Sequence, residues 1–280
     1  MGKPDMGQYF DTHKAQYSWR DYRIPTQVAA IEAIRSVTPD DSLTVSNMLL
    51  WLLQSKRTQG WDTPLNTVDA VYAFLTGTAK ATLTADAVMP DVRIDDVKAV
   101  LPKSSAALGY TKMSRDATGV KSVDIDKQTD GTSWGAVYTV ATQPLSDVKK
   151  SAAGMTVERQ FFKDGHRITD LSGLRVGDRI TVRIVVTADR DYDFVQIADH
   201  RAACMEPVIQ TSGYSNGCYM AMKDNATYYY YSAMSKGKHH IETTYYIDRT
   251  GDYRTGLCTA QCAYSPAFAA RDVSTVVTVR

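Results

Sequence analysis

The sequence predicts a mainly β protein of the α+β class, in which a short helical segment precedes a small β module and a C-terminal antiparallel β-sandwich. Apolar residues recur at helical spacing as far as Gly77, and from residue 81 they alternate with a period of two. Turn signals then recur at short, regular intervals, as they do in β-sandwiches. We expect the three segments to span residues 1–78, 79–151 and 152–280.

Three stretches of the first segment have the periodicity of amphipathic helices. Pro25 suits a first helical position, and the capping residues Asp41 and Thr63 precede the second and third stretches. Three short helices with apolar faces need more partners than this segment contains, so we expect them to end a larger helical array. The expected core positions are Ile24, Val28, Ile31 and Ile34, then Val45, Met48, Leu49, Leu52 and Leu53, then Leu65, Val68, Tyr72 and Leu75.

The second segment has the alternation of short strands. It occurs at residues 82–87, around Val92 and Ile94, and again around Val123 and Ile125. Another strand is expected at residues 134–140. The Asp95-Asp96 pair suits a turn better than paired acid–base chemistry.

The third segment predicts seven or eight antiparallel strands separated by turns such as Lys163-Asp164-Gly165. The expected strands are residues 156–162, 178–188, 192–199, 218–222, 227–232, 239–248, 253–264 and 274–279.

Charge and hydropathy exclude two classes of function. Lys plus Arg number 32 against 31 Asp plus Glu, so the chain lacks the basic surplus that nucleic-acid binding requires. No apolar run is long enough to span a membrane, and the first residues lack the apolar region of a signal peptide.

The four cysteines all lie in the last third of the chain, which favours disulfides and an oxidising compartment. Cys258 and Cys262 would be about 13 Å apart in one strand, beyond disulfide reach. Two complete sets then remain. We expect the nested pairs Cys204–Cys262 and Cys218–Cys258, and the crossed set is the alternative.

A run of four tyrosines, residues 228–231, falls in an expected strand. Tyr229 and Tyr231 share one face and form a candidate binding surface for sugar or peptide. Because aromatic residues favour strands, packing of one face into the core is the preferred interpretation.

No motif of a metal site, cofactor site or hydrolase is present, so we expect no catalytic residue, no metal and no cofactor. A Cys218, His239 and Asp248 set is imaginable, but a catalytic cysteine normally lies in a recognisable motif. A cysteine hydrolase is therefore the weakest alternative.

Together the segments resemble the C-terminal region of bacterial alpha-2-macroglobulins. Residues 61–71, WDTPLNTVDAV, resemble the last helices of that family's α/α-toroid thioester domain, and the β module takes the place of its CUB-like strands. Residues 192–199, YDFVQIAD, the Cys204-Met205-Glu206-Pro207 motif and residues 262–268, CAYSPAF, resemble its final macroglobulin domain.

The resemblance implies a non-catalytic fragment of an exported protease trap, located in the periplasm or at the cell surface. Its partners would be proteases, through the longer protein, and the N-terminal macroglobulin domains. Neither residues 204–207 nor residues 258–261 contain the family's Cys-Gly-Glu-Gln thioester, so the fragment would act as scaffold or moving domain. An extracellular adhesion or glycan-binding sandwich is the main alternative.

Overall fold

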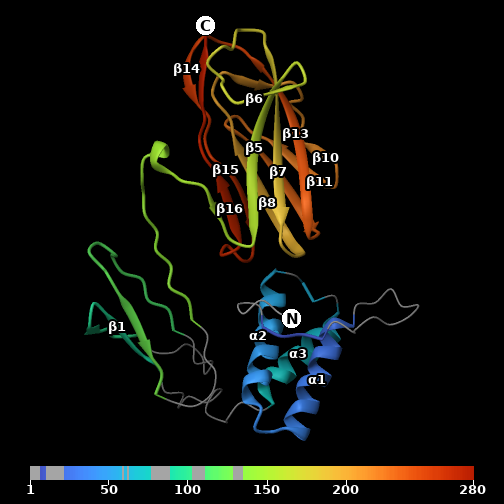
Figure 1. The fold of residues 1–280 in the computed structure, drawn as a ribbon, viewed down its shortest axis with the longest axis vertical. Helices are drawn as coiled ribbons and strands as arrows, with labels where there is room; N and C mark the ends of the chain where they lie inside the picture. The colour runs from blue at the N-terminus through green and yellow to red at the C-terminus, as the bar shows by residue number, and fades with distance from the viewer. Residues whose placement is uncertain are drawn as a thin grey trace. The chain divides into compact units, whose positions relative to one another are not determined.

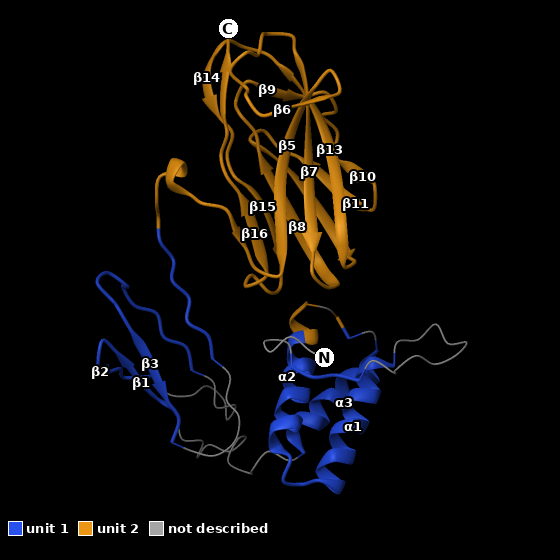
Figure 2. Ribbon diagram, in the orientation of Figure 1, with its two compact units in different colours: residues 1–54, 61–141 blue, residues 55–60, 142–280 orange. Residues whose placement is uncertain are grey.

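The computed structural model describes residues 7–10, 22–58, 60–61, 63–76, 89–102, 111–128 and 135–280. The chain forms two compact units, residues 1–54 with 61–141 and residues 55–60 with 142–280 (Figure 2). One hydrophobic core gathers residues of the helices, and a second, larger core fills the β-sandwich. No helix in the described part of the chain has the length and apolarity to cross a membrane.

Three helices form where the periodicity predicts them: α1 (Arg23–Val37), α2 (Ser42–Thr58) and α3 (Pro64–Leu75). Asp41 Oδ1 accepts a hydrogen bond from the Thr44 amide at 3.1 Å, and Thr63 Oγ1 accepts one from the Asn66 amide at 3.2 Å. The predicted faces of α1 and α2 are confirmed, with the following residues buried: Ile24, Val28, Ile31, Met48, Leu49 and Leu52.

The predicted core face of α3 is wrong. Ala70 and Ala73 are fully buried, whereas Leu65 is 71% exposed. The small side chains let α3 lie close to its neighbours, and Arg35 of α1 donates a 3.0 Å hydrogen bond to the Ala73 carbonyl. The larger apolar residues consequently form an exposed face, here called the α3 outer face, made of Leu65, Val68, Tyr72 and Leu75.

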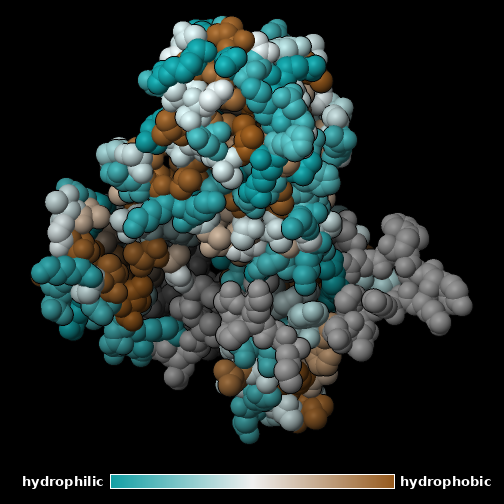
Figure 3. Space-filling view, turned by 45° about the horizontal axis from the view of Figure 1, so that its top comes forward, coloured by the Kyte–Doolittle hydropathy of each residue, from teal (hydrophilic) through white to brown (hydrophobic). Residues whose placement is uncertain are grey.

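A three-stranded antiparallel sheet has the order β2-β1-β3, with β1 at Asp91–Ile94, β2 at Val97–Lys98 and β3 at Val123–Asp126. Asp95 and Asp96 form the β1–β2 turn with positive φ angles of 48° and 66°. Apolar side chains gather on this sheet, at the left in Figure 3, and Val97 and Ile125 are 70% and 54% exposed.

Two further strands were expected in this segment, at residues 82–87 and 134–140. The alternation at residues 82–87 lies outside the described residues, as does Trp134. The strand expected at residues 134–140 is wrong for its described part, because residues 135–140 are exposed and pair with no neighbouring strand.

The C-terminal unit is an antiparallel sandwich of two sheets (Figure 1). The seven-stranded sheet has the order β10-β11-β12-β8-β15-β16-β4, and the five-stranded sheet has the order β6-β5-β7-β13-β9. The first comprises β10 (Gly213–Ser215), β11 (Cys218–Met222), β12 (Ala226–Met234), β8 (Tyr192–His200), β15 (Cys258–Cys262), β16 (Ala269–Asp272) and β4 (Ser151–Ala152). The second comprises β6 (His166–Ile168), β5 (Met155–Lys163), β7 (Arg179–Ala188), β13 (Gly237–Ile247) and β9 (Met205–Pro207).

Seven predicted strands are confirmed within two residues at each end: β5, β7, β8, β11, β12, β13 and the last strand, β17 (Val276–Val279). The stretch expected as one strand at residues 253–264 is instead two, β14 (Gly251–Arg254) and β15, in different sheets. β14 pairs with β17. Gly256 permits the crossing, because a Cβ there would lie 2.3 Å from His200 Cβ.

Candidate functional site

A charged side chain lies in the middle of the sandwich core. Residues of β5 alternate inward and outward, and the inward positions are Met155, Val157, Arg159 and Phe161. Arg159 is 7% exposed, and its guanidinium forms a salt bridge at 2.9 Å with Asp199 of β8, in the opposite sheet. Both side chains in this pair are 2% exposed, so the ion pair is shielded from solvent.

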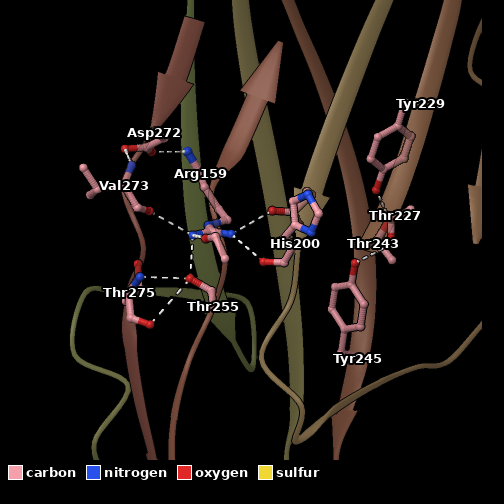
Figure 4. Close-up of polar contacts among 12 residues, drawn as sticks. Arg159, His200, Thr227, Tyr229, Thr243, Tyr245, Thr255, Asp272, Val273 and Thr275 are labelled. Atoms are coloured by element: carbon pink, nitrogen blue, oxygen red, sulfur yellow. Dashed lines mark hydrogen bonds and ion pairs between the residues drawn. The ribbon is translucent and has the colours of Figure 1, made fainter. Parts of the chain in front are cut away.

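The guanidinium has further acceptors around it (Figure 4). Nη1 donates to the His200 carbonyl at 3.1 Å, and Nη2 donates to Thr255 Oγ1 at 2.6 Å. Nη2 also donates to the carbonyls of Gly256 and Val273, each at 2.9 Å. Arg159 Nε has no hydrogen-bond partner among the described residues, but the five bonds of Nη1 and Nη2 offset much of the cost of burying the charge.

The backbone of Arg159 is held as well. Its amide donates to Asp272 Oδ2 at 2.8 Å, and Lys150 forms a salt bridge with Asp272 Oδ1 at 2.8 Å. Burial raises the pKa of Asp272, but the hydrogen bonds from Lys150 and from the amides of Arg159 and Val273 outweigh it and lower the net pKa. Asp272 therefore stays ionised in the folded protein at neutral pH.

Cys258 lies between the two carboxylates in the register of the sheet, facing Asp199 on one side and Asp272 on the other. Burial, with the neighbouring Asp199 carboxylate second, raises the pKa of the Cys258 thiol far above its ordinary value. Cys258 is thus a neutral core side chain rather than a nucleophile.

Two reciprocal hydrogen bonds tie the sheets together beside this network (Figure 4). Tyr229 of β12 bonds Thr243 of β13, while Tyr245 of β13 bonds Thr227 of β12 at 2.9 Å. Each sheet therefore supplies one tyrosine and one threonine. Burial raises the pKa of both tyrosine hydroxyls, so they remain protonated donors.

This cluster, here called the Arg159 network, comprises Arg159, Asp199, Asp272, Thr255 and Lys150. Its groups contact one another and the backbone. An arginine guanidinium does not exchange protons at ordinary pH. Four segments distant in sequence, β5, β8, the β14–β15 connection and β16, meet at it, so its chemistry suits fixing the two sheets together.

The predicted disulfides are not formed. All four cysteines are free and buried. Cys218 lies on β11 and Cys258 on β15, with β12 and β8 between them, so strand spacing separates them by about 14 Å. Cys262 is the register partner of Val195, near the start of β8, whereas Cys204 follows the other end of β8. These two cysteines therefore lie toward opposite ends of that strand. The thiols give no support for an oxidising compartment.

The imagined Cys218, His239 and Asp248 set is not brought together. His239 lies near the start of β13 and Asp248 just after its end, about 30 Å apart in an extended strand. His239 Nε2 contacts the Ser235 carbonyl at 2.7 Å, and Asp248 is paired with Arg249.

The tyrosine run has the alternation expected, and packing of one face into the core, the preferred interpretation, is confirmed, so Tyr229 and Tyr231 do not form the candidate binding surface. Tyr229 and Tyr231 are 1% and 8% exposed and belong to the sandwich core. Tyr228 and Tyr230 lie on the outer face, where their rings stack with centroids 6.3 Å apart.

The Arg159 network was not predicted from the sequence. One signal was available: Arg159 interrupts a strictly apolar inward row of β5, and an inward charge requires a buried partner. The partner's identity depends on which strands lie opposite, which local patterns do not specify. Among the described residues, no group of three histidine, cysteine, aspartate or glutamate side chains is placed to bind a metal ion.

Residues 154–267 match the sequence model of the bacterial alpha-2-macroglobulin MG10 domain. The sandwich therefore resembles the MG10 domain of bacterial alpha-2-macroglobulins. The family resemblance inferred from the motifs is thereby confirmed for the MG10 domain, which contains Arg159, Asp199 and Thr255 of the network. No curated protein matches the chain.

Solved alpha-2-macroglobulins are similar to this chain at low sequence identity, and the first of the following reaches a TM-score that indicates a shared fold. The Escherichia coli protein activated by porcine elastase has 13% identity and a TM-score of 0.50, covering 94% of this chain and 24% of that chain. The trypsin-activated Escherichia coli protein has 12% identity and a TM-score of 0.49, covering 94% and 19%. The Salmonella protein reacted with methylamine has 15% identity and a TM-score of 0.44, covering 95% and 18%. The chain with its MG10 domain therefore spans about a quarter or less of these structures.

Proposed function

We propose that the chain is a non-catalytic C-terminal portion of a bacterial alpha-2-macroglobulin-like protease trap, in which the MG10 domain acts as scaffold or moving domain. The observation that carries this proposal is the Arg159 network inside a domain of this family. Together with the Tyr229–Thr243 and Thr227–Tyr245 bonds, it joins both sheets through their interior. A sandwich tied in this way moves as one rigid body.

Proteases are the proposed partners, reached through the longer protein. Two structures of the Escherichia coli protein with which the chain shares its fold are described as activated by porcine elastase and by trypsin. By analogy, a protease would act on another region of the longer protein, and the MG10 domain would be displaced with the body that encloses the protease.

The helices and the small sheet support a place within a larger assembly. The α3 outer face leaves Leu65, Val68 and Tyr72 at 71%, 62% and 52% exposure, which is unusual for a solvated helix. We assign residues 1–78 to the end of an α/α toroid and residues 79–151 to a CUB-like module. The N-terminal macroglobulin domains of the longer protein are the proposed intramolecular partners, in the periplasm or at the cell surface.

Incubation with porcine elastase tests this function. The longer protein should be cut in a single region and should then retain active elastase that cleaves small chromogenic peptides but not large protein substrates. The present chain alone should leave elastase activity unchanged, because it supplies no enclosing body. Failure of the longer protein to retain any protease, or inhibition by this chain alone, contradicts the proposal.

A further inference from the structure

An outward-facing aromatic row crosses the edge of the seven-stranded sheet. Tyr214 of β10 is the register partner of Tyr219 of β11, and Tyr219 is the partner of Tyr230 of β12. The three side chains are 85%, 36% and 42% exposed. Partners in register point to the same face, so the three rings form one continuous surface across two strand spacings, about 10 Å.

The rings in this row are ordered by one another. Tyr214 and Tyr219 make an edge contact with centroids 5.1 Å apart, and Tyr230 stacks on Tyr228 with an interplanar angle of 14°. Mutual packing holds the rings in place before any ligand arrives, which lowers the entropic cost of binding.

The same row continues into uncharged hydrogen-bonding groups. Tyr230 pairs in register with Gln196 of β8, and Gln196 pairs with Gln261 of β15. Both glutamines are partly exposed. Each primary amide supplies two donors and an acceptor, which is the complement that vicinal hydroxyl groups require.

A hollow of 890 Å³ open to solvent lies at the end of the stacked pair, lined by Lys223, Asp224, Asn225, Tyr228 and others. Its volume is within the range of small-molecule sites. The charges of Lys223 and Asp224 offset each other, and the aromatic and amide row has no formal charge. An anionic polymer would therefore gain little there.

We propose that the row Tyr214, Tyr219, Tyr230, Gln196 and Gln261, with Tyr228 at its end, binds a neutral oligosaccharide. The C–H faces of pyranose rings would lie flat on the tyrosines, and their hydroxyls would bond the two glutamine amides. The outer face of the sheet replaces the Tyr229 and Tyr231 face as the binding surface. This inference does not depend on the protease-trap function.

Titration of the full chain with neutral hexasaccharides, namely cellohexaose, maltohexaose, mannohexaose and chitohexaose, tests it by calorimetry. At least one should bind saturably, and Tyr230→Ala and Tyr214→Ala should each weaken that binding by about tenfold. Tyr230→Phe keeps the ring and should remain within about threefold of wild type. Unchanged melting temperatures confirm that the variants are folded.

The matched control is Tyr246→Ala. Tyr246 is 41% exposed, as Tyr230 is 42%, but it lies on the outer face of the five-stranded sheet. Its removal should leave the affinity unchanged. The proposal is overturned by absence of saturable binding, by equal loss in Tyr246→Ala, or by tighter binding of octaproline or of a heparin hexasaccharide. Self-association of the chain that depends on Tyr230 and occurs without sugar binding also overturns it.

Discussion

At the residue scale, Arg159 is the position on which the sandwich interior depends. Its guanidinium serves one carboxylate, one hydroxyl and three carbonyls, all from segments distant in sequence. Removal of either charge leaves the other buried without compensation, and this costs far more than the intact pair contributes. The sensitivity of the fold to substitution should therefore be concentrated here.

Asp199→Ala should lower the free energy of unfolding of the sandwich by about 3–5 kcal/mol, because it leaves the Arg159 charge uncompensated. Arg159→Met should cost at least as much, since it leaves Asp199 without its cation and also removes the donor to the Gly256 and Val273 carbonyls. The double variant should lose less than the two single losses added together. Urea unfolding followed by near-ultraviolet circular dichroism measures all three.

Arg183→Met is the control for that series. Arg183 pairs with Glu242 at 2.6 Å on the adjacent strand, but the pair is about two-fifths exposed. An exposed pair contributes about 0–1 kcal/mol. If Arg159→Met unfolds at the same urea concentration as Arg183→Met, the buried network does not hold the sheets together.

Asp272 makes stability depend on acid pH. Its folded pKa is lower than its unfolded pKa of about 3.9, so the contribution is complete above that value and is lost as pH falls through the folded pKa. Asp272→Asn should be less stable than wild type at pH 7, and the difference should shrink below about pH 4. A difference that stays constant from neutral to acid pH would show that the Asp272 charge is not linked to folding.

The cysteines should behave as buried thiols. Burial raises the pKa of all four, so the native protein should react slowly with Ellman's reagent. After unfolding in urea without reductant, four thiols per chain should react. Fewer than four would indicate that a disulfide forms despite the separation of the strands.

At the element scale, periodicity predicted the long strands and the helices because their own side chains decide which face is buried. Seven sandwich strands and the inner faces of α1 and α2 follow from local pattern alone. The predictions from periodicity are wrong where a neighbouring element determines which residues are buried or where a strand ends. α3 turns its alanines inward because α1 lies close. Residues 251–262 divide between two sheets at Gly256, where the Cβ of His200 leaves no room for a side chain.

The candidate site shows the same limit. Arg159 pairs with Asp199 only because their strands face one another across the core. The same holds for the two bonds Tyr229–Thr243 and Thr227–Tyr245. Strand order in a β-sandwich is set by long-range contacts that short patterns do not contain. Asp199 ends the family motif at residues 192–199, but the motif does not show that Arg159 is its partner.

Substitutions on the α3 outer face and on the buried face of α3 should differ in their effect on stability. Leu65→Glu should change the stability of this chain by about 0.5 kcal/mol or less, since the side chain is largely solvated here. Ala73→Glu should unfold the helices, because Ala73 is fully buried. Circular dichroism at 222 nm during urea unfolding separates the two.

In the longer protein Leu65→Glu should become strongly destabilising, because the proposed toroid covers this face. A loss as small as in the present chain would contradict the toroid assignment. A large loss already in the present chain would instead show that the α3 outer face is covered within residues 1–141.

At the scale of the whole molecule, the two units contain separate cores, and the sandwich core lies entirely within residues 155–279. The Lys150–Asp272 pair and the β4–β16 pairing also belong to this unit. Residues 55–60 add a hydrogen bond from the Gly60 amide to Asp193 Oδ2 at 2.6 Å and a contact of Arg57 with the Phe268 ring, but the core residues themselves all come from the sandwich, which has the composition of an independent domain.

Residues 142–280 produced alone should therefore fold and melt cooperatively at the temperature of the sandwich transition in the full chain. Differential scanning calorimetry of both proteins makes the comparison, with a chain beginning at residue 153 as control. The control lacks Lys150 and β4 and should melt at a lower temperature. Failure of residues 142–280 to fold would mean that the sandwich requires the rest of the chain.

The position of Asn225 has a practical consequence for production of the protein. Asn225-Ala226-Thr227 is an acceptor sequence for N-linked sugar, and Asn225 is exposed beside Tyr228 at the hollow. Secretion from yeast or mammalian cells would attach a branched chain there and cover the aromatic row with the host's own sugar. Material for binding work should therefore come from a bacterial host, or carry Asn225→Gln.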